Sequence, residues 1–378
     1  MTTQVIPKPS KPWEVSVKER SKTGSLIVLA AILAGALVKL PDLLDEAVVK
    51  FPDFLPWDVV KLPNIVEALT GIDGKLGFAI SFFLIATGLT FFRVLRTSDI
   101  RAAKDTLLSS FALLGIVLTL IPIVSIVTTV FIKGYKGIHP GLFFNDMALN
   151  SVNDPIKEGG LLHALLGTTL MVFGALLISF PIGVLTALYL TEIRGKLARP
   201  IKFLVQAMSG VPSIVAGLFI LSSLVYPVTK ELSGIMGSFA LTILMIPTIA
   251  RTAEEMLRLI PNDLREAGGA LGATQWRTIS GVVLPAAKSG LVTAIILGVA
   301  RIIGETAPLL LVTGGGDALN ANPTSGPMGS LPYYIWKAFL TGGTEEAFAR
   351  AWGGMLVLLV FIFILFGLAR FLSGRKVG

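Results

Sequence analysis

Long apolar stretches separated by short charged segments make up most of this chain. Eight stretches carry few or no charged residues: 23–38, 76–92, 106–132, 159–191, 203–229, 232–250, 289–316 and 351–369. A helix needs about 20 apolar residues to cross a bilayer, and about 17 is the lower limit. Because the backbone must satisfy its own hydrogen bonds inside the bilayer, each stretch is expected to be helical. The pattern predicts an all-α, polytopic membrane protein.

The placement of lysine and arginine predicts the orientation of the chain. If the N-terminus is cytoplasmic and all eight stretches cross, 21 of the 32 basic residues fall in inside connections. Ten fall outside, and Arg301 lies within a span. Cytoplasmic connections carry the excess of basic residues in membrane proteins, so both termini are predicted to be cytoplasmic. This topology accounts for most of the net charge of +8, and no nucleic-acid partner is expected.

Composition narrows the possible chemistry. Charged residues are 15% of the chain, against about a quarter in an ordinary soluble protein. With no cysteine and two histidines, a disulfide framework, a zinc–cysteine site and a histidine-rich metal centre are excluded, and no cofactor is expected. The chain also lacks a Gly-x4-Gly-Lys-Ser/Thr loop for nucleotide phosphates. Any nucleotide must therefore be bound by another chain.

The first part of the chain is predicted to be an addition to a larger core. Residues 1–105 form an N-terminal extension with two predicted transmembrane helices, and residues 106–378 form a six-helix core. A cleaved signal peptide over residues 1–38 is the alternative, because Ala34-Gly35-Ala36 resembles a small-residue cleavage site. The polar leader of about 22 residues is long for a signal peptide, which favours a retained helix.

The longest inside connection, residues 251–288, has the pattern of a helical hairpin. Asp263 and Glu266 fit a capping box at the start of one helix. Gly272 supplies a turn, and Thr274 is placed to cap a second helix, which is expected to end at Leu284-Pro285. Leu264, Ala267 and Leu271 recur at helical spacing on one face of the first helix. Such a hairpin is suited to docking into a groove of a partner.

This hairpin resembles the EAA loop of ABC-importer permeases. The resemblance rests on Glu266-Ala267-Gly268, on Gly272 and on Val282-Val283-Leu284-Pro285. Gly268 stands where the family has alanine, which should loosen the helix by about 1 kcal/mol. The resemblance implies that residues 263–285 contact an ATPase subunit, with these residues involved: Asp263, Glu266, Ala267, Gly272, Trp276, Leu284 and Pro285. The alternative is a generic amphipathic helix at the membrane surface.

Two further runs resemble the PstA-type permeases of phosphate ABC importers. They are Gly-Val-Pro-Ser-Ile-Val-Ala-Gly-Leu at 210–218 and Arg-Ile-Ile-Gly-Glu-Thr-Ala-Pro-Leu-Leu at 301–310, and the resemblance covers residues 97–373. It implies a type I permease core in a bacterial inner membrane. It also implies a PstC-type second permease, a dimer of ATP-binding subunits and an external phosphate-binding protein as partners. The first 96 residues have no counterpart in the usual six-helix pattern.

The substrate pathway is predicted from charges at membrane depth. Arg301 and Glu305 are the only charged residues in 289–316, and their spacing places them on one helix face, where they can pair. Arg251 ends another core span and offers a second guanidinium, a group that matches phosphate oxygens. We expect both arginines to guide an anion, with Thr306 and Ser213 nearby. A buried ion pair that only fixes helix packing is the alternative.

Prolines within the spans are expected to kink helices, since proline frees backbone groups. They are Pro181, Pro212 and Pro247, and Pro212, beside Gly210 and Ser213, can break its helix and expose N–H groups to an anion. Three other functions stay open from the residues. They are a permease for another oxyanion such as molybdate or sulfate, an intramembrane enzyme acting on lipid phosphates, and a structural scaffold.

Overall fold

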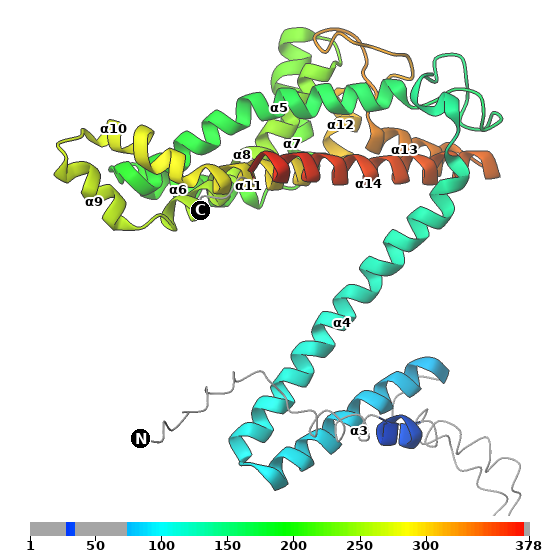
Figure 1. Ribbon diagram of the computed structural model, residues 1–378. Helices are drawn as coiled ribbons and strands as arrows, with labels where there is room; N and C mark the ends of the chain where they lie inside the picture. Colours follow the sequence, from blue (N-terminus) through cyan, green and yellow to red (C-terminus); the bar gives the residue numbers. More distant parts are fainter. Residues whose placement is uncertain (1–27, 35–73, 374–378) are drawn as a thin grey trace, which may run out of the picture. The chain divides into compact units, whose positions relative to one another are not determined.

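The computed structural model describes residues 28–34 and 74–373 (Figure 1). The predicted span at 23–38 therefore lies mostly outside the described residues, as does most of the first external connection; residues 28–34 are helical. The remaining elements, in chain order, are α3 (Gly74–Thr97), α4 (Ile100–Gly134), η1 (Tyr135–Gly137), η2 (Pro140–Phe143), α5 (Leu162–Leu188), η3 (Tyr189–Ile193), α6 (Ala198–Ser209), α7 (Ser213–Ile220), η4 (Leu221–Thr229), α8 (Gly234–Arg258), α9 (Asn262–Ala270), α10 (Gln275–Thr278), η5 (Ile279–Val283), α11 (Leu284–Ile302), α12 (Ala307–Val312), α13 (Leu331–Thr341) and α14 (Glu345–Ser373).

The all-α prediction is confirmed. Over the described residues, six helices are long and apolar enough to cross a membrane, and a bent pair, α6 with α7–η4, makes a seventh. These helices coincide with the predicted stretches from residue 76 onward. The chain forms two compact units, Met1–Val124 and Ser125–Gly378, and the division falls inside α4.

In the first unit, α3 and the start of α4 form a helical hairpin. The turn between them is closed by Asp99, whose Oδ1 accepts a hydrogen bond from the Ala102 N–H at 2.9 Å. This side chain caps the free N–H groups that begin α4. Phe83 of α3 and Phe111 of α4 meet edge to face, with ring centroids 5.8 Å apart.

In the second unit, α8 is the central helix, and α5 and α11 pack along it. Glycines allow this close packing. A Cβ on Gly183 of α5 would lie 2.7 Å from Cγ2 of Ile249, and a Cβ on Gly298 of α11 would lie 2.8 Å from Cγ1 of the same residue. Since real Cβ atoms almost never come so close, the three backbones can approach only because glycine occupies these positions. Met245, Ile249 and Ala253 of α8 are fully buried in the resulting core.

The C-terminal helix α14 packs on this core, and the end of α4 contacts it. Gly137 of η1 lies against the α14 backbone, where a Cβ would be 2.2 Å from the Ala349 carbonyl oxygen and 2.8 Å from Cα of Gly353. Lys133 places its ammonium 4.9 Å from the ring centroid of Trp352. These contacts join the last turns of α4 to the six-helix core.

Candidate functional site

Two spans of the second unit are broken, and the first break lies between α6 and α7. The two halves meet at 103°, across Gly210, Val211 and Pro212. Pro212 lacks an N–H and its ring clashes with the preceding turn, so the helix stops before it and restarts at Ser213. The predicted break at Pro212 is confirmed. By contrast, α5 and α8 continue as helices through Pro181 and Pro247.

The second break separates α11, which ends at Ile302, from α12, which begins at Ala307. Residues 303–306 between them are not helical, and Pro308, in the first turn of α12, has no N–H to donate across the break. The expectation that Arg301 and Glu305 share one helix face is therefore wrong, because Glu305 lies beyond the end of α11. These two side chains form no ion pair in the described part of the chain, and Arg301 is exposed.

The two breaks lie close together because α7 packs against α12. A Cβ on Gly217 of α7 would lie 2.7 Å from Cα of Pro308 in α12. Ser213 begins α7 one turn before Gly217, and Thr306 directly precedes α12, two residues before Pro308. The N-terminal ends of two short helices therefore lie near this contact. The first N–H groups of a helix have no partner within it, and they favour an anion.

Arg251 and Arg301 lie on adjacent helices and do not touch. Ile249 of α8 contacts Gly298 of α11. Arg251 comes two residues after Ile249, and Arg301 comes three residues after Gly298. The helices run in opposite directions, so Arg251 lies toward the α9 end and Arg301 toward the α12 end. Both side chains are exposed on the isolated subunit.

At the α9 end of this unit, the predicted helical hairpin is present with two changes. Gly272 turns the chain at φ +74°, and the Thr274 hydroxyl accepts from the Arg277 N–H at 3.4 Å, as expected of a cap. However, Pro261 occupies the cap position of α9, so Asp263 is not the cap. Asp263 lies within the first turn, where its negative charge still favours the N-terminus of the helix.

The second change concerns Leu284 and Pro285, which were expected to end the second helix. Instead, α10 continues through the π-helical turn η5 into α11 without interruption. Pro285 lies two residues after η5 and has no N–H to donate to the preceding turn. The wider π turn at Ile279–Val283 changes the backbone register ahead of the proline ring. The hairpin is therefore rigidly continuous with a membrane span.

The packing around Gly268 explains why this chain has glycine where the family pattern has alanine. It is buried against α10, and a Cβ there would lie 2.7 Å from Cγ2 of Thr278 and 2.8 Å from its Oγ1. The neighbouring Gly269 has open space around it. Alanine at 268 would push the two helices apart, so the glycine that lowers helix propensity also permits the close contact between α9 and α10.

The outer surface of the hairpin is apolar and uncovered. Leu264 is 40% exposed, Trp276 64% and Leu271 88%, and Glu266 and Ala267 are exposed beside them. Large apolar side chains left exposed on a hairpin indicate a contact with a partner. Among the predicted coupling residues, Glu266, Ala267 and Trp276 are exposed here.

An ion pair at this end, Arg265 with Glu192, was not predicted. Arg265 Nη2 lies 2.9 Å from Glu192 Oε1, and Nε lies 3.0 Å from Oε2. The same guanidinium donates to the Ile260 carbonyl at 2.6 Å and to the Leu257 carbonyl at 2.8 Å. Hydrogen bonding to Glu192 raises the pKa of Arg265. No local signal links residues 73 positions apart, so this pair could not be predicted from the sequence.

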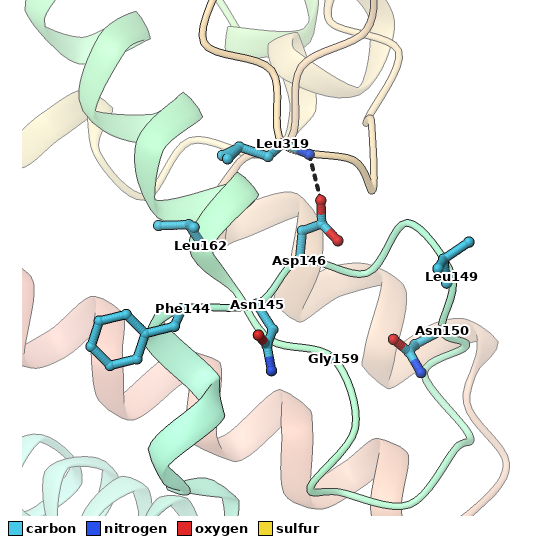
Figure 2. Close-up of a pocket in the computed structure, with 8 residues that line it drawn as sticks. All are labelled: Phe144, Asn145, Asp146, Leu149, Asn150, Gly159, Leu162 and Leu319. Carbon is cyan, nitrogen blue, oxygen red and sulfur yellow. Dashed lines mark hydrogen bonds between the residues drawn. The ribbon is translucent and has the colours of Figure 1, made fainter.

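Figure 1 shows α9 and α10 at one end of the second unit and the loop before α5 at the other. At that other end, two loops meet around the pocket in Figure 2. Its lining residues are Phe144, Asn145, Asp146, Leu149, Asn150, Gly159, Leu162 and Leu319. Asp146 joins the loops, because its Oδ2 accepts from the Leu319 N–H at 2.9 Å (Figure 2) and its Oδ1 from the Ala148 N–H at 3.2 Å. These donors lower the pKa of Asp146.

A buried arginine fixes the loop before α5 to α14. Arg350 is 1% exposed, and its Nη2 donates to the carbonyl oxygens of Asp154, at 3.1 Å, and Pro155, at 2.6 Å. It has no acidic partner among the described residues. Its Nη1 lies 3.7 Å from the sulfur of Met147 and its buried Nε has no partner, so the two carbonyls at 154 and 155 are the oxygens through which Arg350 holds the loop.

Comparison with known proteins identifies the family. Residues 179–377 match the family described as binding-protein-dependent transport system inner membrane component. The chain belongs to this family. It is 36% identical to the phosphate transport system permease protein PstA 1 of Mycobacterium tuberculosis (strain CDC 1551 / Oshkosh), over 69% of this chain and 86% of that protein. It is also 36% identical to PstA of Pasteurella multocida (strain Pm70), over 73% of this chain and 96% of the relative.

A solved structure, the MetNI methionine ABC transporter in an inward-facing conformation, is similar with a TM-score of 0.43 and 26% identity, over 56% of this chain and 90% of that one. The family match confirms the predicted class: a multi-pass, non-catalytic membrane component of an ABC transport system. Permeases of this family work with an ATPase and a binding protein. The open surface on α9 and α10 and the loops at the other end are therefore candidate contact surfaces for these two partners.

Proposed function

We propose that this permease is the membrane subunit of an ATP-driven phosphate importer. The observation that carries the proposal is the meeting of two broken spans, α6–α7 and α11–α12, beside Arg301. Discontinuous helices whose N-termini face the substrate are typical of transporters for anionic substrates. The PstA relatives, whose names specify phosphate, support the choice of anion.

In this proposal Arg301 and Arg251 guide the anion in turn. Arginine stays charged at any relevant pH and can bind two phosphate oxygens at once. Glu305 offsets part of the Arg301 charge, so that phosphate is released rather than held. The hydroxyl groups of Ser213 and Thr306, at the starts of α7 and α12, complete the polar lining of the path.

The proposed complex pairs this chain with a PstC-type second permease. Two ATP-binding subunits dock on the cytoplasmic face, one of them on α9 and α10, and an external phosphate-binding protein docks on the opposite loops. The basic bias of the connections supports cytoplasmic placement of both termini. Residues 1–105 are an extension outside the transport core of residues 106–378.

Reconstitution of the whole complex tests the substrate. ATP hydrolysis in proteoliposomes is expected to rise several-fold when the binding protein is loaded with phosphate. Stimulation by molybdate or sulfate in place of phosphate would establish the other oxyanion permease. Hydrolysis that follows none of these anions would leave the scaffold as the better explanation.

Arg301→Gln tests the pathway. The substitution removes the charge and keeps a polar side chain of similar length. Because a hydrogen bond to a charged group contributes about 1.5–3 kcal/mol, phosphate uptake is expected to fall about 10- to 100-fold in an assembled complex. Arg96→Gln removes an exposed arginine in the last turn of α3, outside the transport core; it is the control and should leave uptake unchanged. Normal uptake by an assembled Arg301→Gln complex would refute the role of Arg301.

A further inference from the structure

Helix α6 presents three different faces, and only one of them packs on the protein. At 100° per residue, Ile201, Val205 and Met208 fall on one side, and Val205 is buried there against the rest of the core. A second side carries Phe203 and Leu204, which are 68% and 57% exposed. The third side is polar and exposed, with Arg199, Lys202 and Gln206.

The direction of α6 places these faces relative to a membrane. It meets α7–η4 at 103°, so it runs across the direction of that apolar segment. If α7–η4 crosses the bilayer, α6 lies along the surface of the membrane. An apolar side next to a basic side is the arrangement of helices that lie in the interface, with the apolar residues at the acyl boundary.

The cations of this segment are largely unpaired. Residues 193–209 contain Arg194, Lys196, Arg199 and Lys202 and no acidic residue. Within the described part of the chain, Lys196 and Arg199 have no hydrogen bond or ion pair, and both are exposed. Lys202 lies 3.9 Å from Glu254 of α8, with half of its side chain exposed. The charge is therefore available to an external anionic surface.

We propose that α6 is an interfacial helix that binds the headgroups of anionic phospholipids in the cytoplasmic leaflet through Lys196, Arg199 and Lys202. This proposal rests on the orientation given above and is independent of the transported anion. Each basic residue near an anionic membrane surface adds about 1 kcal/mol to binding. Phe203 and Leu204 enter the boundary with the acyl chains, while the ion pair of Lys202 with Glu254 keeps α6 attached to α8.

Lipid binding to the full chain, purified in detergent, tests the charges. Phosphatidylglycerol is expected to bind more tightly than phosphatidylcholine, as read from lipid adducts in native mass spectrometry. The double variant K196Q/R199Q should weaken phosphatidylglycerol binding by about tenfold or more. The matched control, K136Q/K157Q, removes two exposed lysines at the other end of the same unit and should have no effect. Equal losses in both variants, or no preference for the anionic lipid, would overturn the proposal.

A second measurement tests the placement of the helix. Because the chain has no cysteine, Leu204→Cys and Gln206→Cys each introduce a single labelling site. In vesicles containing phosphatidylglycerol, a spin label at 204 should be accessible to oxygen, and one at 206 to a water-soluble relaxation reagent. If both sites meet the water-soluble reagent and are shielded only when the ATPase is added, α6 is a protein-docking surface and the lipid proposal fails.

Discussion

Gly268 and Gly269 are adjacent glycines in α9 with opposite surroundings. A side chain at 268 would collide with Thr278, whereas one at 269 meets nothing within 4 Å. Alanine favours a helix over glycine by about 1 kcal/mol in both positions. The two substitutions therefore share the same gain in helix propensity and differ in packing alone.

We expect Gly268→Ala to loosen the contact between α9 and α10, and Gly269→Ala to tighten the helix. Hydrogen–deuterium exchange over residues 262–283 of the full chain is the measurement. Exchange should become faster in Gly268→Ala and slower in Gly269→Ala. The double variant G268A/T278A removes the colliding atoms and should restore slow exchange. Equal protection in the two single variants would show that the contact with Thr278 does not limit the hairpin.

Single residues also mark the limit of inference from sequence. Arg301 was identified because one charge in a long apolar run is conspicuous. Its position relative to Glu305 was not predicted correctly. Residues four apart lie on one face only inside a helix, and α11 ends at Ile302. The role of Arg350 could not be predicted, because its partners are the backbone carbonyls at 154 and 155, which no side chain in the sequence marks.

At the scale of the elements, four prolines that each remove a backbone N–H have different effects on their helices. Helices α5 and α8 continue through Pro181 and Pro247, and a π turn precedes Pro285. Only Pro212, which follows Gly210 closely, accompanies a break. Proline reliably removes an N–H, but whether the helix bends, breaks or changes register depends on the packing of neighbouring helices. The sequence therefore predicted the break at Pro212, where glycine and serine flank the proline, and it did not predict that α5 and α8 would continue through theirs.

The Arg265–Glu192 pair connects α9 to η3, the end of α5, so it is expected to transmit movement of the hairpin. Arg265→Gln and Glu192→Gln should each lower the amount of phosphate transported per ATP hydrolysed in proteoliposomes. Because both changes break the same pair, the double variant should be little worse than either single one. This prediction depends on the proposed transport function.

Lys288→Gln serves as the control for this pair. Lys288 is exposed in the first turns of α11, close to the hairpin, and its replacement should leave the transport ratio unchanged. Additive losses in the double variant would show that Arg265 and Glu192 act separately.

At the scale of the whole second unit, Asp146 ties together loops that are far apart in the sequence. Its pKa is lowered mainly by the Leu319 N–H, so the folded state favours the charged form. A carboxylate with a lowered pKa stabilises the fold above its unfolded pKa of about 3.9, and this stabilisation disappears as the pH falls through the folded value. The loops should therefore be less stable in acid.

Asp146→Asn tests this linkage, because the neutral amide accepts weaker hydrogen bonds from the two N–H groups. The apparent melting temperature in detergent should be lower than that of the wild type at pH 7. The difference should shrink as the pH falls from 7 below the unfolded pKa of about 3.9 and through the lowered pKa of the folded carboxyl. A difference that stays the same size over this range would mean that the charge of Asp146 is not responsible.

The π turn η5 has a consequence for how this chain can change length. It holds one more residue per turn than an α-helix between the α9–α10 hairpin and α11. Each residue added or removed in a helix rotates everything beyond it by about 100°. One insertion or deletion between Thr278 and Pro285 would turn the hairpin away from Glu192, together with the exposed side chains of Leu271 and Trp276. The direction in which the α9–α10 surface faces therefore depends on the number of residues between the hairpin and the membrane span. This short segment should tolerate substitutions far better than changes in length.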